Sequence, residues 1–314
     1  MFSKEPDPEP MGVPLGELQT ILQSTTLKSK LKNNCLEVSY ENLTAVLTVE
    51  KPPGAKETNQ EVEAIVSIKT FLPKEMQEIF SKPAFLMDHA NRMATFASLI
   101  RDDEGVYLGS RLTIYKDEPG WNIYFPLLLY SLICTNEIFN HTLRYMFKPE
   151  SESTEVSEVS KWTNQDFELT KLYLEEISLC NVGGLGFTAE FGIEQDDVST
   201  VAGHQTALWR MFADQPHPVM GGGLFCILEL PFSFEESTLL TVINLLNKSE
   251  MNLDDLPPHF GAWTIGNRKD NPAYVSFLPN IMHSEAKNIQ VNMSMWANAR
   301  VQSAKSILSL NKYI

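Results

Sequence analysis

The sequence predicts an α+β protein of two related domains, each an antiparallel sheet packed with helices. The chain of 314 residues is long enough for two domains of common size. Residues 149–168, "PESESTEVSEVSKWTNQDFE", have the acidic, Ser- and Thr-rich composition of an exposed linker. On both sides of this linker the same order of predicted strands and helices recurs. We therefore assign residues 1–14 to a disordered tail, 15–148 to an N-terminal domain and 169–314 to a C-terminal domain.

The N-terminal domain opens with a predicted helix at 14–32, "PLGELQTILQSTTLKSKLK", whose apolar residues recur at helical spacing. Two strand candidates follow, "LTAVLTVE" and "VEAIVSIKTFLP", joined by the polar connection "KPPGAKETNQE". A helix over 75–93 precedes a hairpin formed by "TFASLIRD", the turn "DEG" and "VYLGSRLTIY". A long apolar helix over 121–147, with an expected break at Pro126, ends the domain.

The C-terminal domain shows nearly the same order. It begins with the strand-like "LYLEEISLCNVGGLGFTAEFGIE", bent at Gly183 and Gly184, and continues with "TALWRMFAD" and "LFCILELP". The helix "EESTLLTVINLLN" follows the capping candidate Ser233. A hairpin of "FGAWTIG" and "AYVSFLPN" then leads into the final helix, "NIQVNMSMWANARVQSAKSIL".

Matching details indicate that one domain has been duplicated. A strand ending in Leu-Pro precedes the middle helix of each half, at Pro73 and at Pro231. Asn91 and Asn247 lie near the ends of those helices, and each helix is followed by an aromatic-bearing hairpin. The pattern predicts a tandem of two α+β domains.

Composition restricts the class of partner. A net charge of -15 argues against binding of nucleic acid, which depends on clustered Lys and Arg. The only basic run, Lys28, Lys30 and Lys32, is interpreted as the solvated end of a helix. The longest apolar run, 124–134, is shorter than the roughly 20 residues that span a bilayer, so no transmembrane helix is predicted. Four cysteines lie far apart among apolar neighbours, which indicates reduced thiols and a cytoplasmic protein: Cys35, Cys134, Cys180 and Cys226.

No motif identifies a reaction, and we predict no catalytic residue, no cofactor and no metal. The glycines of "VGGLGFTAEFG" precede a strand-like alternation, whereas a dinucleotide-binding loop must open a helix. None of the six histidines pairs at a metal-binding spacing, and no Gly-x-Ser-x-Gly occurs. One alternative stays open: His204, His217 and His259 lie in turns flanked by Gly or Pro, where they could converge as a metal or acid–base cluster.

The aromatic residues of the predicted sheets and closing helix suggest a binding surface instead. Most of them belong in the core, because a half-buried sheet needs such residues. A remainder exposed on a sheet face or groove would bind a peptide. The candidate binding surface comprises six residues: Trp209, His217, His259, Trp263, Asn280 and Trp296.

The segment "ANRMATFASLIRDDEGVYLGSRL" resembles the bacterial sensory transduction regulator family, which is part of the type III secretion chaperone-like superfamily. In that family a helix bearing Asn leads into a strand, an acidic turn and a strand of the form "VYLRSRL". The matching residues here are Asn91, the turn at 102–105, and Val106, Tyr107, Leu108, Ser110, Arg111 and Leu112. In the second half, "GGGLFCILELP", "LPPHFGAW" and "VSFLPN" resemble bacterial proteins of the same broad fold.

The resemblance implies a protein-binding fold without catalytic residues, which in secretion chaperones is a small acidic homodimer that holds an extended segment of a client. We therefore expect a non-catalytic, chaperone-like or regulatory protein of bacterial type. Its two domains would form a pseudo-dimer in one chain, which acts as a monomer or as a homodimer. The alternative is a small-molecule sensor or enzyme with a pocket in the C-terminal domain near His217, His259 and Asp255.

Overall fold

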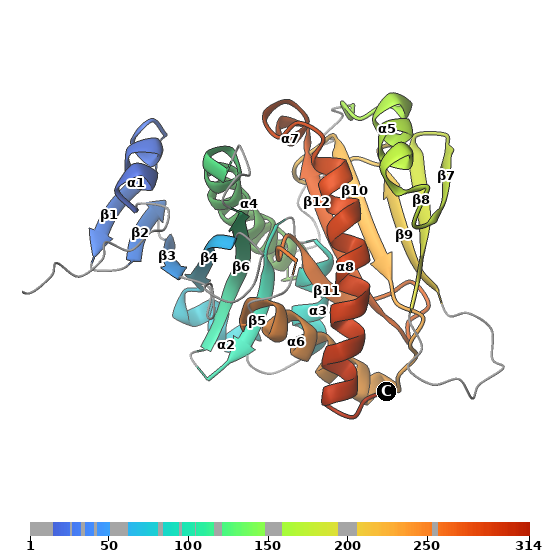
Figure 1. Cartoon of the computed structure of the whole chain (residues 1–314). Helices are drawn as coiled ribbons and strands as arrows, with labels where there is room; N and C mark the ends of the chain where they lie inside the picture. Colours follow the sequence, from blue (N-terminus) through green and yellow to red (C-terminus); the bar gives the residue numbers. More distant parts are fainter. Residues whose placement is uncertain are drawn as a thin grey trace, which may run out of the picture.

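A computed structural model describes most of the chain, and the predicted tail, the connection at 51–61 and the first half of the predicted linker, 149–158, lie outside the described residues. Within the described residues, two six-stranded antiparallel sheets lie side by side with helices packed against them (Figure 1). The structure describes residues 15–25, 27–32, 35–40, 43–50, 62–80, 84–93, 96–103, 105–115, 121–147, 159–193, 206–252 and 257–314.

Each half of the chain supplies one sheet and its helices. The N-terminal half contains α1 (Leu15–Gln23), β1 (Lys28–Lys32), β2 (Cys35–Tyr40), β3 (Leu43–Glu50), β4 (Val62–Phe71), α2 (Lys74–Phe80), α3 (Ala84–Arg92), β5 (Ser98–Asp102), β6 (Gly105–Tyr115) and α4 (Trp121–Phe147). The C-terminal half contains α5 (Asn164–Leu174), β7 (Leu179–Gly183), β8 (Gly186–Gly192), β9 (Thr206–Phe212), β10 (Gly223–Glu229), α6 (Glu236–Asn252), β11 (Ala262–Ile265), β12 (Pro272–Pro279), α7 (Asn280–Glu285) and α8 (Ile289–Leu310).

The two sheets have the same topology. The strand order is β1-β2-β3-β4-β6-β5 in the first sheet and β7-β8-β9-β10-β12-β11 in the second, so each strand has a counterpart in the other sheet. Helices α1 and α4 pack on the first sheet, and α5 and α8 pack on the second. Buried apolar side chains from both halves form one connected core. The α+β prediction, with two similar sheet-and-helix domains, is confirmed.

The predicted first helix is too long. Helix α1 ends at Gln23, where the hydroxyl of Thr25 donates to the carbonyl of Leu22 at 2.6 Å and accepts from the amide of Leu27 at 3.1 Å. Such side-chain bonds compete with the backbone bonds of a helix. The following lysines therefore form the edge strand β1 and not a helix end, and the sequence prediction for them was wrong.

Several other boundaries differ from the prediction. The single helix predicted over 75–93 is two helices, α2 and α3. Helix α4 continues through Pro126 without the expected break, and the apolar side chains around this position, Phe125 and Leu128, are fully buried in the core. Helix α5 begins at Asn164, inside the predicted linker, so the start of "LYLEEIS" is helical and not strand-like. The short helix α7 was not predicted.

The two halves meet through equivalent elements. Helix α3 of the first half contacts β11 of the second, helix α6 of the second contacts β5 of the first, and β5 and β11 contact one another. Phe96 and Phe260, each two residues before one of these strands, pack edge to face with ring centroids 5.4 Å apart. The junction therefore has approximate two-fold symmetry within one chain.

An asparagine on each junction helix binds the edge strand of its own half. The amide of Asn91 accepts a hydrogen bond from the N–H of Leu99 at 2.7 Å and donates one to the carbonyl of the same residue at 3.2 Å. Asn247 makes the same pair of bonds with Trp263, at 2.8 and 3.0 Å. Each side chain thus satisfies backbone groups that a neighbouring strand would otherwise bind.

We expect the Asn247→Ala variant to lose about 3 kcal/mol of unfolding free energy, because it leaves the buried N–H and C=O of Trp263 without partners. Urea denaturation followed by tryptophan fluorescence measures the loss. The matched control is Asn164→Ala at an exposed helix start, for which a change within about 0.5 kcal/mol is expected. Equal losses in the two variants would contradict the assigned role of Asn247.

Candidate functional sites

Glu250, near the end of α6, is the centre of a buried polar network. Its Oε1 accepts hydrogen bonds from Nε1 of Trp263 at 2.8 Å and from Nε of Arg300 at 2.9 Å. Its Oε2 lies 2.6 Å from Nδ1 of His259. The other ring nitrogen of His259 lies 2.7 Å from Oγ of Ser98, which belongs to β5. The network therefore links the two halves of the chain.

Arg300 keeps Glu250 in its charged form. Burial raises the pKa of Glu250, but the positive charge of Arg300 and the hydrogen bonds from His259 and Trp263 outweigh it, so the pKa lies below its ordinary value. Arg300 also donates to a backbone carbonyl of the loop before β11 at 2.6 Å and lies 3.7 Å from the ring centroid of Tyr274. The buried ion pair is thus hydrogen-bonded on both sides, as its burial requires.

Ser98, His259 and Glu250 stand in the order of a serine hydrolase triad. A hydrolase needs a nucleophile that substrate can reach, and these side chains are 0%, 0% and 1% exposed. The backbone N–H of His259 also donates to the carbonyl of Arg111 in β6 at 2.8 Å, which fixes the loop against the first sheet. The arrangement is therefore suited to holding the halves together and not to catalysis.

We expect Glu250→Gln to destabilise the protein by about 3–5 kcal/mol, because it leaves the Arg300 charge buried without a counter-charge. The double variant Glu250→Gln with Arg300→Met should regain part of this loss, and the exposed control Glu285→Gln should change little. Denaturant midpoints measure all three. A double variant less stable than the single one would argue against the ion pair as the cause.

His217 lies in the loop between β9 and β10 and is held neutral. Its Nδ1 accepts hydrogen bonds from the backbone N–H groups of Val219 and Met220, both at 3.2 Å. Its Nε2 is 3.4 Å from the carbonyl of Met93, in the other half of the chain. Burial lowers the pKa of His217 to about 4, although the bond to Met93 opposes this shift.

The lowered pKa of His217 predicts a loss of stability in weak acid. The unfolded state binds the proton near pH 6.5 and the folded state only near pH 4, so the stabilisation is complete above pH 6.5 and is lost as the pH falls towards 4. Between pH 7 and pH 5 the loss should be about 2 kcal/mol. The His217→Asn variant can still accept the loop N–H bonds but cannot titrate. If urea midpoints of the variant fell as steeply with pH as those of the parent protein, this assignment would be wrong.

The other residues of the predicted binding surface lie apart. Nε1 of Trp209 donates to Oγ of Ser294 at 2.9 Å inside the C-terminal domain. Asn280 accepts from the N–H of Lys161 and donates to the carbonyl of Val159, both at 2.8 Å, and so fixes the chain that enters α5. Trp296 is half-buried and stacks on Phe260 with centroids 5.6 Å apart. Five of the six predicted residues, all but Trp296, are buried, and the structure does not gather the six on one exposed surface.

The described residues do not form the predicted histidine pocket. His217 packs against Phe225 and Phe277, whereas His259 packs against Tyr274 and the Glu250 network. His204 and Asp255 lie outside the described residues. In the described part of the chain, no three His, Cys, Asp or Glu side chains are grouped so that they could hold a metal ion.

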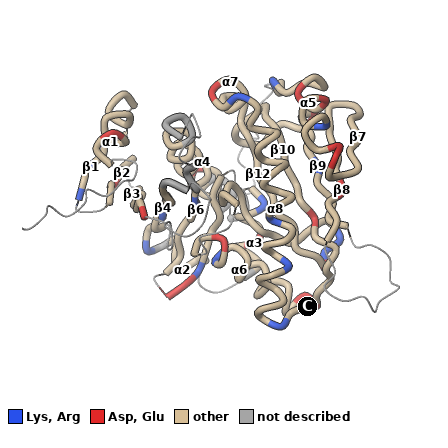
Figure 2. The backbone as a smooth tube through the Cα atoms, viewed as in Figure 1, with Lys and Arg blue, Asp and Glu red and all other residues tan. Residues whose placement is uncertain are grey.

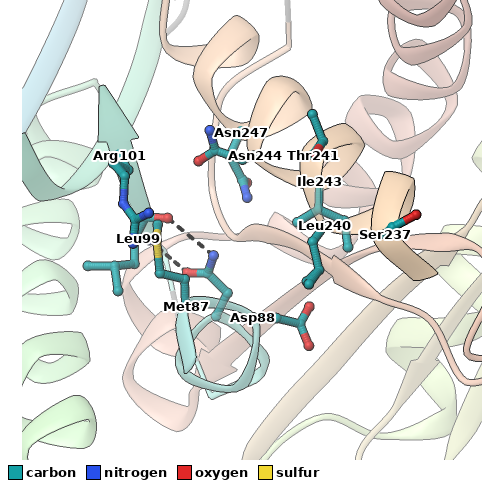
Figure 3. Close-up of a pocket in the computed structure, with 11 residues that line it drawn as sticks. Met87, Asp88, Leu99, Arg101, Ser237, Leu240, Thr241, Ile243, Asn244 and Asn247 are labelled. Carbon is teal, nitrogen blue, oxygen red and sulfur yellow. Dashed lines mark hydrogen bonds between the residues drawn. The ribbon is translucent and has the colours of Figure 1, made fainter. Parts of the chain in front are cut away.

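A cavity of about 300 Å³ does lie at the junction, between α3 and α6 (Figure 3). The N-terminal half lines it with Met87, Asp88, Asn91, Leu99 and Arg101. The C-terminal half lines it with Ser237, Leu240, Thr241, Ile243, Asn244 and Asn247. Sequence reasoning singled out Asn91 and Asn247 as equivalent residues, but it gave no signal that their helices face each other across a cavity.

Large exposed apolar side chains occur in succession along α5, the turn after it and β7, which is the edge strand of the second sheet within the described residues. Leu172 and Tyr173 on α5, Ile177 in the turn after it and Leu179 at the start of β7 are 65%, 59%, 51% and 77% exposed. We call these four residues the α5–β7 patch. Exposed acidic residues lie on α5, on the turn after it and on β8: Glu168, Glu175, Glu176 and Glu190. Figure 2 shows acidic stretches of backbone in the region of α5, β7 and β8, together with a basic stretch on α5, which carries Lys171. The patch was missed in the sequence because its helical part was assigned to a strand.

Comparison with known proteins supplies no relative for this chain. Family models, curated proteins and solved structures were searched, and none matches. Within the described part of the chain, none of the helices has the length and hydrophobicity needed to span a bilayer. The resemblance to the chaperone-like superfamily therefore stays a prediction, and the function has to be argued from the geometry.

Proposed function

We propose that the chain is a non-catalytic, chaperone-like or regulatory protein that binds an extended segment of a protein partner at the α5–β7 patch. The observation that carries this proposal is the exposure of four large apolar side chains on α5, the following turn and β7, which is the edge strand of the second sheet within the described residues. Contiguous exposed apolar residues with a polar rim are typical of interaction sites. An edge strand offers unpaired backbone groups to which an extended segment can add as a further strand.

The equivalent strand of the first sheet supports this choice by contrast. Strand β1 has three exposed lysines, Lys28, Lys30 and Lys32, and lysines on an edge strand oppose pairing with another chain. Strand β7, with the sequence "LCNVG", has no charge. Of the two equivalent outer edges, the one beside α5 is therefore the one open to a partner strand.

The acidic rim of the patch indicates the chemistry of the partner segment. Side chains of an added strand alternate between the two faces of the sheet, so one set would meet Leu179 and the other set would meet α5. The nearby carboxylates favour Lys or Arg between the apolar residues of the segment. The same acidity, and the net charge of -15, disfavour nucleic acid as the partner.

We infer a cytoplasmic protein of bacterial type that acts as a monomer. The four cysteines Cys35, Cys134, Cys180 and Cys226 are free thiols, which suits a reducing compartment. The junction of α3, α6, β5 and β11 supplies within one chain the contacts that two copies of a single domain would make with each other. The chain would thus be its own pseudo-dimer. A sensor or enzyme site at His217 and His259 is not favoured, because both side chains are sealed in the core.

Short fluorescent peptides test the proposal directly. We expect a peptide of alternating Val and Lys to bind in an anisotropy titration, and a peptide of alternating Val and Glu to bind much more weakly. The Leu179→Asp and Tyr173→Asp variants should each weaken binding of the Val–Lys peptide about tenfold, because both remove apolar contact area. Reversing the rim with Glu175→Lys and Glu176→Lys should shift preference to the Val–Glu peptide.

The matched control is Leu310→Asp, since Leu310 is 83% exposed but lies at the end of α8. Its effect on peptide binding should be negligible, and thermal melts should show all variants folded. The proposal is wrong if neither peptide binds, or if the control weakens binding as much as Leu179→Asp.

A further inference from the structure

The cavity between α3 and α6 differs on its two equivalent sides. Asp88 and Asn244 occupy the same position, three residues before Asn91 and Asn247 respectively. The Oδ1 atom of Asp88 binds the opposite half of the chain: it accepts from Oγ1 of Thr264 and from the N–H of Ile265, both at 2.7 Å. On the other side, the buried Oδ1 of Asn244 has no hydrogen-bond partner among the described residues.

Arg101, on the same side of the cavity as Asn244, has a second buried atom without a hydrogen-bond partner among the described residues. Arg101 in β5 is equivalent to Ile265 in β11. Each lies two residues after the strand residue whose backbone binds the asparagine, Leu99 in β5 and Trp263 in β11. Nη2 of Arg101 donates to the carbonyl of Phe80, which orients the guanidinium, but its buried Nε has no partner among the described residues. Buried polar atoms without partners are rare in folded proteins and call for an explanation, such as a ligand.

The groups around the cavity set the charge of a ligand that would fit. Arg101 and Asn244 offer one cationic donor and one neutral acceptor, while Asp88 places a negative charge on the wall. Oδ2 of Asp88 binds Nε of Arg92 at 3.0 Å and, as a carboxylate oxygen, can accept another donor. A purely anionic ligand such as phosphate would bind Arg101 but would offer no donor to the carboxylate of Asp88, which is paired with Arg92, or to Oδ1 of Asn244. A ligand with one carboxylate and one ammonium group would match both ends of the cavity, with the carboxylate at Arg101 and the ammonium at Asn244 and Asp88.

We propose that this cavity binds a small zwitterion of the amino-acid class with an aliphatic side chain. Its carboxylate accepts from Arg101, its ammonium donates to Asn244 and Asp88, and its side chain packs against Leu240 and Ile243 (Figure 3). The volume of about 300 Å³ accommodates a ligand of that size. Because α3 and α6 come from different halves, the ligand would contact both domains. This site is separate from the α5–β7 patch.

Calorimetric titration and thermal melts with L-leucine test the proposal, and two analogues test the charges. Leucine amide lacks the carboxylate, and 4-methylpentanoate lacks the ammonium group. We expect saturable binding of L-leucine with a raised melting temperature. Each analogue should bind at least about tenfold more weakly, since each leaves one buried polar group without its partner.

Three variants locate the binding site. Arg101→Met should weaken binding of L-leucine by about tenfold or more, whereas Arg268→Met, at an exposed arginine outside the cavity, should leave it unchanged. Thr241→Phe fills the cavity from its exposed side without removing any hydrogen bond of the junction, so it should block binding while the protein remains folded. If L-leucine does not bind, if the analogues bind as tightly, or if Thr241→Phe binds normally, the proposal is wrong. Tighter binding of inorganic phosphate would also overturn it.

Discussion

Two strand edges in the middle of the molecule, β5 and β11, need hydrogen-bond partners, and the rest of the architecture depends on how this need is met. Asn91 and Asn247 provide some of these hydrogen bonds, because each binds the backbone of its strand as a neighbouring strand would. The helices that carry these asparagines must then lie at the junction. There α3 reaches β11 and α6 reaches β5, so each half covers part of the other. The two domains consequently share one core instead of folding as separate bodies on a linker.

The two equivalent parts of this junction differ in their polar side chains. Near the end of α6, the Glu250 network buries a carboxylate, a guanidinium and an imidazole, and all three are hydrogen-bonded. A buried charge is tolerated only when its partners are complete, so this network holds its part of the junction in place. Elsewhere on the same helix, and on β5, Asn244 and Arg101 line a cavity, and Oδ1 of Asn244 and Nε of Arg101 have no hydrogen-bond partner among the described residues. The junction thus contains one complete polar network and one cavity whose polar groups are incompletely hydrogen-bonded.

The outer edges of the two sheets also differ. Strand β1 carries three exposed lysines, whereas β7 is uncharged and, like α5, exposes apolar side-chain surface. Neither edge is needed to close the core, because the helices α1 and α5 already cover the adjacent apolar faces. Their side chains were therefore free to change, and only the β7 edge is suited to an added strand.

The sequence by itself determined much of the local structure. Alternating apolar residues predicted the strands β3, β4, β9 and β10, turn residues predicted both hairpins, and the repeated order predicted two similar domains with equivalent asparagines. It predicted that most of the sheet aromatics are buried, but it could not tell which of His217, His259, Trp209 and Trp263 are, because an aromatic residue or histidine has the same identity on a surface as in an interior. Nor could it show that Ser98 meets His259 at 2.7 Å, or that Arg101 and Asn244 line one cavity. Those contacts join segments more than a hundred residues apart, and only the packing of one half against the other decides them.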